Sequence, residues 1–316
     1  MISAGELSNA GQSALVDVVV VAYNSRDQLR ACVEPLLAVP EARVIVVDNA
    51  SPDASLDVVQ GLPVTAIQRE SNGGFATGVN AGWRAGSSPY VLLLNPDARI
   101  DAESLRALTH VLDEAPAVGA VAPRIVNDDG SLDHSQRRFP RLRSTYARAL
   151  FLHRLFPGAA WTDELVRDED TYARRGTPEW VSGACVLVRR EALVALDGLD
   201  EGFFMYSEDV DLCRRLRSAG YGLVFEPAAV VEHVGGASAP RAGLLPALAA
   251  SRVRYARKHH GRLVAFLERM GIALDAATHA LIGRGGRTAR AGHARALLTV
   301  AKPVATSHPA RAEPPL

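Results

Sequence analysis

The chain has 316 residues, with 35 Lys and Arg residues against 35 Asp and Glu residues, so its formal net charge is zero. Hydrophobic residues make up 48% and charged residues 22%, which are globular proportions and exclude a disordered, collagenous or coiled-coil chain. The length provides for one large domain or two ordinary ones. Balanced charge argues against a chain-wide nucleic-acid surface, which needs an excess of basic residues, so no nucleic-acid partner is expected.

Three features of the sequence indicate the cellular compartment of the protein. The cysteines are Cys32, Cys185 and Cys213, an odd number in apolar or helix-forming surroundings, which predicts reduced, buried thiols. The first fifteen residues lack a basic segment followed by an apolar core, so no secretory signal is expected. No run reaches the roughly 18–20 apolar residues of a membrane span. These patterns predict a cytoplasmic protein, with peripheral contact to the inner face of the cell membrane left open.

The first half of the chain alternates buried strands with helices. The β-branched run at 16–21 predicts a strand buried on both faces, and Ser25 is a candidate N-cap for the helix after it. Such alternation predicts right-handed crossovers and a mainly parallel sheet of the α/β class, with ligands bound beyond the carboxyl ends of the strands. Further strands are predicted at 44–47, 64–67 and 90–94, and helices at 57–60, 76–85 and 105–112.

The second half is less regular. Its segments are a strand at 118–126, a loop with some helix at 141–178, a strand at 181–188 interrupted by Ser182-Gly183-Ala184, a helix at 209–219 ended by Gly220, a strand at 223–231 and an Arg-rich helical stretch at about 244–282. The predicted organisation is a flexible tail at 1–14, an α/β domain at 15–240, a helical C-terminal extension at 241–302 and a disordered tail at 303–316.

Two of the predicted strands end in an acidic residue. Asp48 follows the strand at 44–47, and Asp97 closes Asn95-Pro96-Asp97 after the strand at 90–94. Because the carboxyl ends of parallel strands meet at one edge of a sheet, these carboxylates are expected to converge there. Hard oxygen ligands at such a site suit Mg²⁺ or Mn²⁺. The alternative for Asn-Pro-Asp alone is a turn followed by an N-cap.

Three further segments carry candidate chemistry. Glu208-Asp209 follows an apolar segment at a helix start, so it provides either a general base in a partly apolar pocket or charges that complement the helix dipole. His233 ends a strand ahead of two glycines and is a metal ligand, a phosphate donor or a satisfied loop histidine. The glycine-dense segment 71–80 opens a helix, where backbone amides approach a phosphate or form a tight turn. It matches neither the Walker loop nor the dinucleotide-binding pattern.

Taken together, seven short motifs in this order resemble glycosyltransferase family 2, and the nearest subgroup resembles the rhamnosyltransferases of cell-wall and O-antigen assembly. The resemblance spans roughly residues 16–238. The motifs are Val20-Val21-Ala22-Tyr23-Asn24, Val46-Val47-Asp48-Asn49-Ala50-Ser51, Asn72-Gly73-Gly74-Phe75, Leu94-Asn95-Pro96-Asp97, Trp180-Val181-Ser182-Gly183-Ala184, Ser207-Glu208-Asp209-Val210-Asp211 and His233-Val234-Gly235-Gly236.

The resemblance implies roles for particular residues. It implies a GT-A nucleotide-sugar-binding fold in which Asp48 contacts the nucleoside and Asp97 is the metal-binding end of an Asp-x-Asp-type motif, whose first position here is Asn95. His233 matches a histidine in the metal shell of related galactofuranosyltransferases. Asp209 is the implied catalytic base, and Glu208 supports it or positions the acceptor. The implied nucleotide-sugar-binding residues are Ala22, Tyr23, Asn24, Asp48, Asn72, Gly73, Gly74, Asn80, Asn95 and Asp97, and those on the acceptor side are Trp180, Gly183 and Arg138.

The implied activity is an inverting, metal-dependent sugar transfer with Mg²⁺ or Mn²⁺ as cofactor. The donor would be a nucleoside diphosphate-sugar such as dTDP-rhamnose, and the acceptor a glycan or a polyprenyl-diphosphate-linked sugar. Alternatives are another donor (UDP-galactofuranose, UDP-N-acetylglucosamine or GDP-mannose) or a non-catalytic nucleotide-sugar- or glycan-binding module.

Two basic segments are open to more than one interpretation. The arginines between 137 and 175 form either a solvated loop or a contact with a lipid diphosphate. The helical stretch 251–270 mixes basic and apolar residues, and it either packs on the catalytic domain or lies on an anionic membrane surface.

Overall fold

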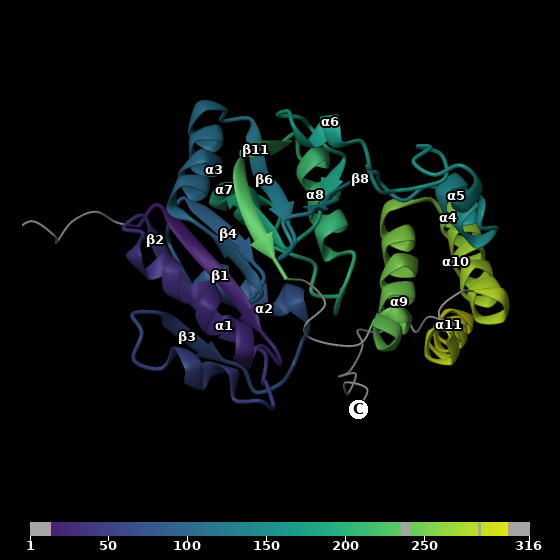
Figure 1. The fold of residues 1–316 in the computed structure, drawn as a ribbon, viewed down its shortest axis with the longest axis horizontal. Helices are drawn as coiled ribbons and strands as arrows, with labels where there is room; N and C mark the ends of the chain where they lie inside the picture. Colours follow the sequence, from purple (N-terminus) through teal and green to yellow (C-terminus); the bar gives the residue numbers. More distant parts are fainter. Residues whose placement is uncertain (1–13, 235–240, 284–285, 303–316) are drawn as a thin grey trace, which may run out of the picture.

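The computed structural model describes residues 14–234, 241–283 and 286–302. It has a curled central sheet with helices on both faces, and a group of C-terminal helices on one side (Figure 1). Apart from Ala14, the tails expected at 1–14 and 303–316 lie outside the described residues.

The central sheet confirms the expected α/β class. Its strand order is β3-β2-β1-β4-β10-β6-β11-β5, with β7 paired to β6, and β8 and β9 form a separate two-stranded sheet. Six strands run in one direction, while β10 is antiparallel to its neighbours β4 and β6, and β5 is antiparallel to β11. The strands are β1 (Val16–Ala22), β2 (Ala42–Asp48), β3 (Thr65–Gln68), β4 (Tyr90–Leu94), β5 (Ala98–Ile100), β6 (Val118–Val126), β7 (Leu132–Asp133), β8 (Gln136–Arg137), β9 (Trp180–Val181), β10 (Cys185–Arg189) and β11 (Gly222–His233).

The helices include the expected ones and several that the sequence did not predict, among them α7. They are α1 (Arg26–Val33), α2 (Phe75–Ala85), α3 (Ala102–Glu114), α4 (Leu142–Ala149), α5 (Leu152–Leu155), α6 (Glu169–Tyr172), α7 (Arg190–Ala195), α8 (Glu208–Ser218), α9 (Arg241–His259), α10 (Arg262–Ile282) and α11 (Gly286–Ala301), with 3₁₀ turns η1 (Glu34–Ala38) and η2 (Ser55–Val59). The helix expected at 57–60 is the 3₁₀ turn η2.

Strand β1 is buried on both faces, as its apolar run predicts. Val18 and Val20 pack into a core under α1 and α3, whereas Val19 and Val21 pack into a second core under α2 and α8. Side chains alternate along a strand, so one apolar strand serves two cores. Asp17 is the exception, since its buried carboxylate pairs with arginines from β2 and α7.

Ser25 stands directly before α1, at the expected N-cap position, but its side chain does not cap the helix. Its hydroxyl instead donates to the carbonyl of Tyr23 at 3.1 Å. The first amide of the helix, on Arg26, donates to Asp53 Oδ2 at 3.0 Å, so a carboxylate from the next loop replaces the local cap.

The run predicted as one interrupted strand at 181–188 is two strands in different sheets. Strand β9 pairs with β8, and β10 enters the central sheet between β4 and β6. The three residues between them, Ser182-Gly183-Ala184, therefore cross from the small sheet to the large one. This crossing lies at the carboxyl end of β4, because Ala184 accepts a hydrogen bond from the Asn95 amide at 2.9 Å.

The C-terminal extension is three helices rather than one continuous stretch. The helical pattern at 244–282 breaks between α9 and α10, at His260-Gly261. These helices share a small apolar core, and Tyr255 of α9 joins the core under α2 and α8. In the described part of the chain, no helix is both long and apolar enough to cross a bilayer.

Candidate active site

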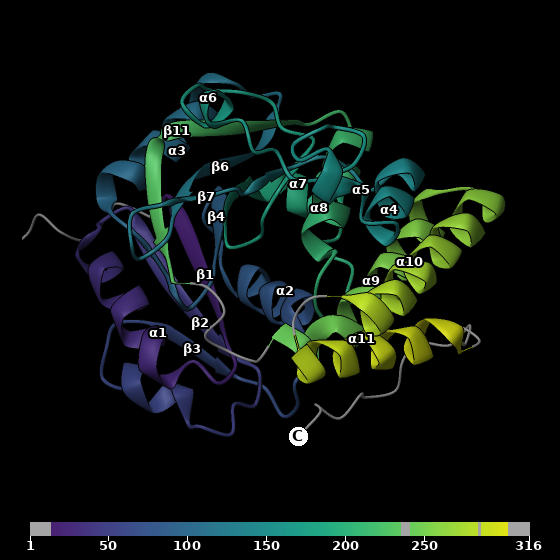
Figure 2. The same ribbon diagram turned by 45° about the vertical axis from the view of Figure 1, so that its right-hand side comes forward.

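Strands β1, β2 and β4 end at one edge of the sheet, as the acidic strand ends predict. The register pairs Ala22 with Asp48 and Val20 with Leu94, so Asn95 and its successors emerge beside Asp48. Figure 2 shows α2 lying beside these strand ends. Asn24 and Ala50 follow directly with φ of 53° and 59°, a conformation that costs energy outside glycine and clusters at binding sites.

Asp48 presents an acceptor atom at this edge. Its side chain is only 2% exposed, and Oδ2 accepts from the Ser51 amide at 3.1 Å. Oδ1 has no hydrogen-bond partner among the described residues. An unpaired buried carboxylate oxygen is costly unless a ligand satisfies it, so this atom suits a hydroxyl or amine of a nucleoside.

The glycine segment is tied to this edge and to the loop before α8. Asn49 donates its side-chain amide to the Gly74 carbonyl at 2.9 Å, and Asn72 Oδ1 accepts from the Gly74 amide at 2.9 Å. Gly74 has φ of 91°, and a Cβ there would lie 2.1 Å from the carbonyl oxygen of Phe204. The glycine is therefore required for close contact with the 203–207 loop, and Gly73 packs against Thr77.

His233 and Asp97 meet beyond the sheet edge. The pairing of β5 with β11 aligns His233 with Ala98, and this places His233 Nε2 3.2 Å from Asp97 Oδ1 and 3.3 Å from Asn95 Nδ2. On the other side of the ring, Nδ1 lies 3.9 Å from Asp133 Oδ2. Burial alone would lower the pKa of His233, but the two carboxylates outweigh burial and raise that pKa to about 9.

The donor set around His233 Nε2 fits a hard divalent cation. Within the described ranges, no group of three or more His, Cys, Asp or Glu side chains is arranged to hold a metal. Mg²⁺ and similar ions, however, take one or two protein ligands and complete their shells with substrate phosphates and water. Asp97 and His233 supply two ligands, and the imidazole would release its proton on binding.

Asp209 is held at the start of α8. The residues before it, Tyr206 and Ser207, have φ of 67° and 65°, so the chain turns sharply into the helix. Asp209 Oδ2 accepts from the Gly183 amide at 3.2 Å, and Oδ1 accepts from the Val210 amide at 2.8 Å. Burial raises the pKa of Asp209, although these amides and the charge of Arg137 oppose the rise. A Cβ at Gly183 would lie 3.3 Å from Asp209 Cβ, so the missing side chain permits this approach.

Glu208 does not line the large cavity that Asp209 lines. It lines a small apolar cavity with Leu93, Leu212 and Asp209, and its Oε2 has no hydrogen-bond partner among the described residues. Burial, followed by the charges of Asp209 and Asp211, raises the pKa of Glu208 to about 8. The carboxyl group is therefore protonated at neutral pH. Its predicted contact with an acceptor stays a prediction, and this position favours a structural role.

The crossing segment Ser182-Gly183-Ala184 contacts both Asp209 and the end of β4, which leads to Asp97. In Ser182-Gly183-Ala184, the Gly183 amide binds the Asp209 carboxylate, and the next residue accepts the Asn95 amide. The Ser182 amide donates to the Ser135 carbonyl at 3.0 Å, two residues after Asp133. The Asp209 carboxylate and the backbone of Asn95, two residues before Asp97, are thus bound by neighbouring residues of one backbone segment.

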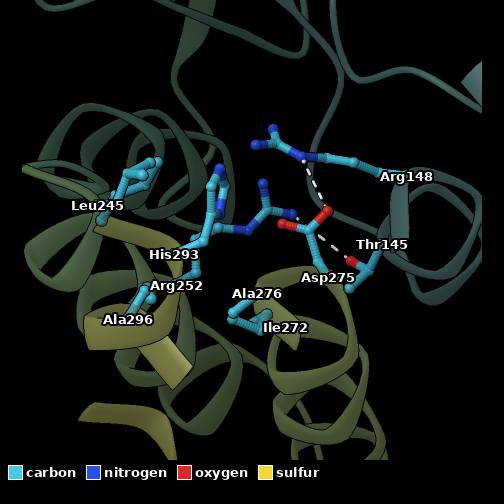
Figure 3. A pocket seen from close by; sticks show the side chains of 11 residues that line it. Thr145, Arg148, Leu245, Arg252, Ile272, Asp275, Ala276, His293 and Ala296 are labelled. Carbon is cyan, nitrogen blue, oxygen red and sulfur yellow. Dashed lines mark hydrogen bonds and ion pairs between the residues drawn. The ribbon is translucent and has the colours of Figure 1, made fainter. Parts of the chain in front are cut away.

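A cavity of about 550 Å³ opens beside Asp209. Trp180 and Arg137 line it on one side, and side chains of α4 and α9 line it on the other. Its walls carry both charged residues and the apolar Leu244, Leu245 and Leu248. Asp97 and His233 are not among its lining residues. A smaller cavity continues between α4 and the C-terminal helices, where Arg148 reaches Asp275 (Figure 3).

Asn80 and Arg138, which were expected to contact the donor and the acceptor, have surroundings in the structure that differ from that expectation. Asn80 is buried, and its amide group is occupied by Leu199, Glu201 and Trp83, which favours a structural role over contact with a nucleotide-sugar. Arg138 turns away from the cavity and donates to the Leu165 carbonyl at 3.0 Å, while Arg137 lines the cavity. Arg137 ends β8 and Arg138 follows it, so the two neighbouring arginines have different surroundings.

The remaining predicted residues lie at the expected places. Ala22 ends β1, and Tyr23 is half-buried directly after it. Trp180 lines the cavity and donates its indole N–H to the Arg138 carbonyl at 2.8 Å. Sequence reasoning missed Asp133, which belongs to the very short strand β7 and leaves no periodic signal. Arg137 is one of the arginines for which the sequence left open a contact with a lipid diphosphate, and the structure places it in the wall of the cavity.

The comparisons with known proteins agree with this geometry. Residues 13–261 match the family described as "Glycosyltransferase like family 2". The chain is 33% identical over 241 residues to N-acetylglucosaminyl-diphospho-decaprenol L-rhamnosyltransferase of Mycobacterium tuberculosis, covering 69% of this chain and 76% of that protein. It is 28% identical over 225 residues to rhamnosyltransferase WbbL of Escherichia coli, covering 68% and 81%.

Solved structures match the fold. Mannosyltransferase PcManGT from Pyrobaculum calidifontis, in complex with GDP-Man and Mn²⁺, aligns with a TM-score of 0.55 at 16% identity, covering 90% of this chain and 86% of that one. Staphylococcus aureus TarS 1-349 aligns with a TM-score of 0.51 at 15% identity, covering 85% and 72%. The fold is that of a GT-A glycosyltransferase. The chain belongs to glycosyltransferase family 2.

The buried Glu208 carboxyl predicts a pH dependence of stability. The folded chain keeps its proton up to about pH 8, whereas an unfolded chain releases it near pH 4.5. The free energy of unfolding should therefore fall across this range, by up to about 1.4 kcal/mol per pH unit. Glu208→Gln keeps the shape without the titration, so its melting temperature should exceed that of the wild type by more at about pH 8 than at about pH 5. The exposed Glu103→Gln is the control, and a difference independent of pH would contradict the assignment.

Proposed function

We propose that the protein is an inverting, metal-dependent transferase that moves rhamnose from dTDP-rhamnose to a lipid-linked sugar in cell-wall or surface polysaccharide assembly. The observation that carries this proposal is the crossing segment 182–184, which binds the Asp209 carboxylate through Gly183 and the backbone of Asn95 through Ala184, two residues before the Asp97 that pairs with His233. A glycosyl transfer needs both a base for the acceptor and stabilisation of the leaving diphosphate.

The donor would lie along the edge formed by β1, β2 and β4. The buried, unpaired Oδ1 atom of Asp48 would accept a hydrogen bond from the nucleoside. Asp97 and His233 would hold Mg²⁺ or Mn²⁺, which when bound neutralises negative charge on the diphosphate. The Mn²⁺ in the complex of the mannosyltransferase PcManGT supports a divalent cofactor, although that match concerns the fold alone.

Asp209 would act on the acceptor. Its carboxylate takes the proton of the acceptor hydroxyl while that oxygen attacks C1 of the sugar from the face opposite the diphosphate. The new glycosidic bond forms as the bond from C1 to the diphosphate oxygen breaks, so one attack inverts the configuration. Burial suits Asp209 to this task, because its raised pKa makes it a better base near neutral pH.

The relatives point to the sugar and the acceptor. The two curated relatives described above are rhamnosyltransferases, which favours rhamnose over the galactofuranose, N-acetylglucosamine and mannose donors. The Mycobacterium tuberculosis relative is named for an acceptor with a diphosphate and a decaprenol chain. The cavity beside Asp209 has the size and the mixed polar and apolar walls for part of such a molecule. A lipid-linked acceptor would also bring the enzyme to a membrane surface.

Arg137 is the residue we assign to the acceptor diphosphate. Four arginines line the cavity, and three of them pair with carboxylates: Arg148 with Asp275, Arg167 with Asp163, and Arg252 with Glu164. Among the described residues, the guanidinium of Arg137 makes no salt bridge, although its charge opposes the rise that burial causes in the pKa of Asp209, and it lies 5.5 Å from the centre of the Trp180 ring. An unpaired guanidinium beside the base suits a phosphate of the bound acceptor.

Asp209→Asn tests the base. The variant should bind dTDP-rhamnose with Mn²⁺ as the wild type does, measured by thermal shift, while turnover falls by about 10²–10⁴-fold. Asp128→Asn replaces an exposed carboxylate in the β6–β7 turn and should change neither quantity. Turnover near that of the wild type in Asp209→Asn would remove Asp209 as the base.

Asp97→Asn and His233→Gln test the metal site. In the presence of dTDP, Mn²⁺ should raise the melting temperature of the wild type, because it binds only the folded protein, and this rise should be lost in both variants. Excess chelator should abolish transfer by the wild type. Glu232→Gln is the matched control, because Glu232 is exposed on the same strand as His233. Full activity with chelator present would refute metal dependence.

Arg137→Gln tests recognition of the acceptor. The acceptor KM should rise by about tenfold or more for a polyprenyl-diphosphate-linked sugar, and stay unchanged for a neutral glycoside that lacks the diphosphate. The control Arg143→Gln removes an exposed arginine of α4 and should leave both KM values unchanged. An equal rise for both acceptors would show that Arg137 does not recognise the diphosphate.

A further inference from the structure

The outer face of α10 is apolar along the length of the helix. Leu263, Phe266, Met270, Leu274 and Leu281 recur at helical spacing and are 36–75% exposed. We call these five residues the α10 stripe. No charged residue interrupts it, and a helix of 21 residues is about 30 Å long. Soluble chains seldom leave so long an apolar surface open to water, so the stripe calls for an occupant.

The opposite face of α10 fixes the direction of the stripe. Ala265, Ile272 and Ala276 are buried, and Glu268 Oε2 accepts from the Thr145 hydroxyl at 2.7 Å. Tyr146 of α4 donates to the Leu267 carbonyl at 2.9 Å. In Figures 1 and 2, α9 lies between the sheet and α10, which forms the outer side of the molecule. The stripe therefore points away from the catalytic domain.

A second group of exposed apolar side chains lies around α5, which contacts the buried side of α10 through His279. Phe151, directly before α5, contacts His279 of α10 with ring centres 4.4 Å apart. Around it, Leu155, Phe156 and Trp161 are 40–72% exposed. Tryptophan is enriched where protein surfaces meet lipid headgroups, because its ring is apolar while its N–H needs a polar partner.

The charge of the C-terminal extension favours a lipid bilayer over a second copy of the chain as the surface that covers the α10 stripe. Residues 241–302 contain 12 Lys and Arg residues and only two acidic residues, Glu268 and Asp275, although the whole chain is balanced. Arg252, Arg254 and Lys258 pair with carboxylates of the catalytic domain, and the remaining excess of basic residues attracts an anionic surface. It also repels a second copy of the same helices, so dimerisation through the stripe is disfavoured.

We infer that the α10 stripe docks on an anionic lipid bilayer, with α10 lying in the plane of the interface. An apolar helix face within a strongly basic segment is the pattern of interfacial helices. The cavity beside Asp209 is lined by α4 and α9, which both contact α10, so docking would bring the helices that line the cavity to the membrane. The advantage of a cavity near the membrane rests on the proposed lipid-linked acceptor. The docking of the α10 stripe on a bilayer does not depend on that proposal.

Vesicle co-sedimentation of the full chain tests this inference. Wild-type protein should bind vesicles of phosphatidylcholine mixed with phosphatidylglycerol, bind phosphatidylcholine alone weakly, and release with rising salt. Phe266→Gln combined with Leu281→Gln should lower the bound fraction by about tenfold, because both side chains insert into the interface and glutamine preserves the helix. Val194→Gln, on the exposed side of α7, is the control and should bind as the wild type does.

Three outcomes would overturn the inference: no binding of the wild type to the mixed vesicles, unchanged binding by the double variant, or a wild-type dimer that the double variant converts to monomer. Transfer to a water-soluble acceptor without lipid should be equal in both proteins. If no nucleotide-sugar is consumed at all while vesicle binding depends on the stripe, the proposed function fails and the docking surface stands.

Discussion

The hydrogen bond from the Gly183 amide to the Asp209 carboxylate is the contact on which the rest of the site depends. Gly183 belongs to three residues that cross from the small β8–β9 sheet to the central sheet, and the next of them binds Asn95 at the end of β4. Because both bonds involve backbone atoms, the position of the Asp209 carboxylate relative to the end of β4 follows from the sheet topology. Rigid positioning of this kind is what a displacement at a sugar carbon requires.

The C-terminal helix α9 contacts the loop before α8 and lines the cavity beside Asp209. Asp200, in the loop that leads to α8, pairs with Arg254 and Lys258 of α9, and Ser251 donates to the Met205 carbonyl at 2.7 Å. The same helix lines the cavity through Leu248. Thus α9 steadies the loop that turns into Asp209, while α10 presents its apolar face outward. Catalytic geometry and membrane docking would then be served by opposite sides of one bundle.

Much of this arrangement could be predicted from the sequence. Continuous β-branched runs give buried strands, and acidic strand ends in a parallel sheet meet at one edge, so Asp48 and Asp97 were expected together. The features that could not be predicted depend on contacts between residues that lie far apart in the sequence. The assignment of β9 and β10 to different sheets, and the outward turn of Arg138, depend on partners more than 20 residues away. Propensity and periodicity report only on neighbours along the chain.

The most direct test of the central claim is a crystal structure with dTDP and Mn²⁺, in which anomalous scattering locates the metal. The account predicts one peak within bonding distance of Asp97 and His233, on the diphosphate side of the donor site, with the Gly183–Asp209 bond intact and the Asp209 carboxylate open to the acceptor cavity. A metal bound away from Asp97 and His233, or a nucleotide lying in the cavity beside Trp180, would contradict it.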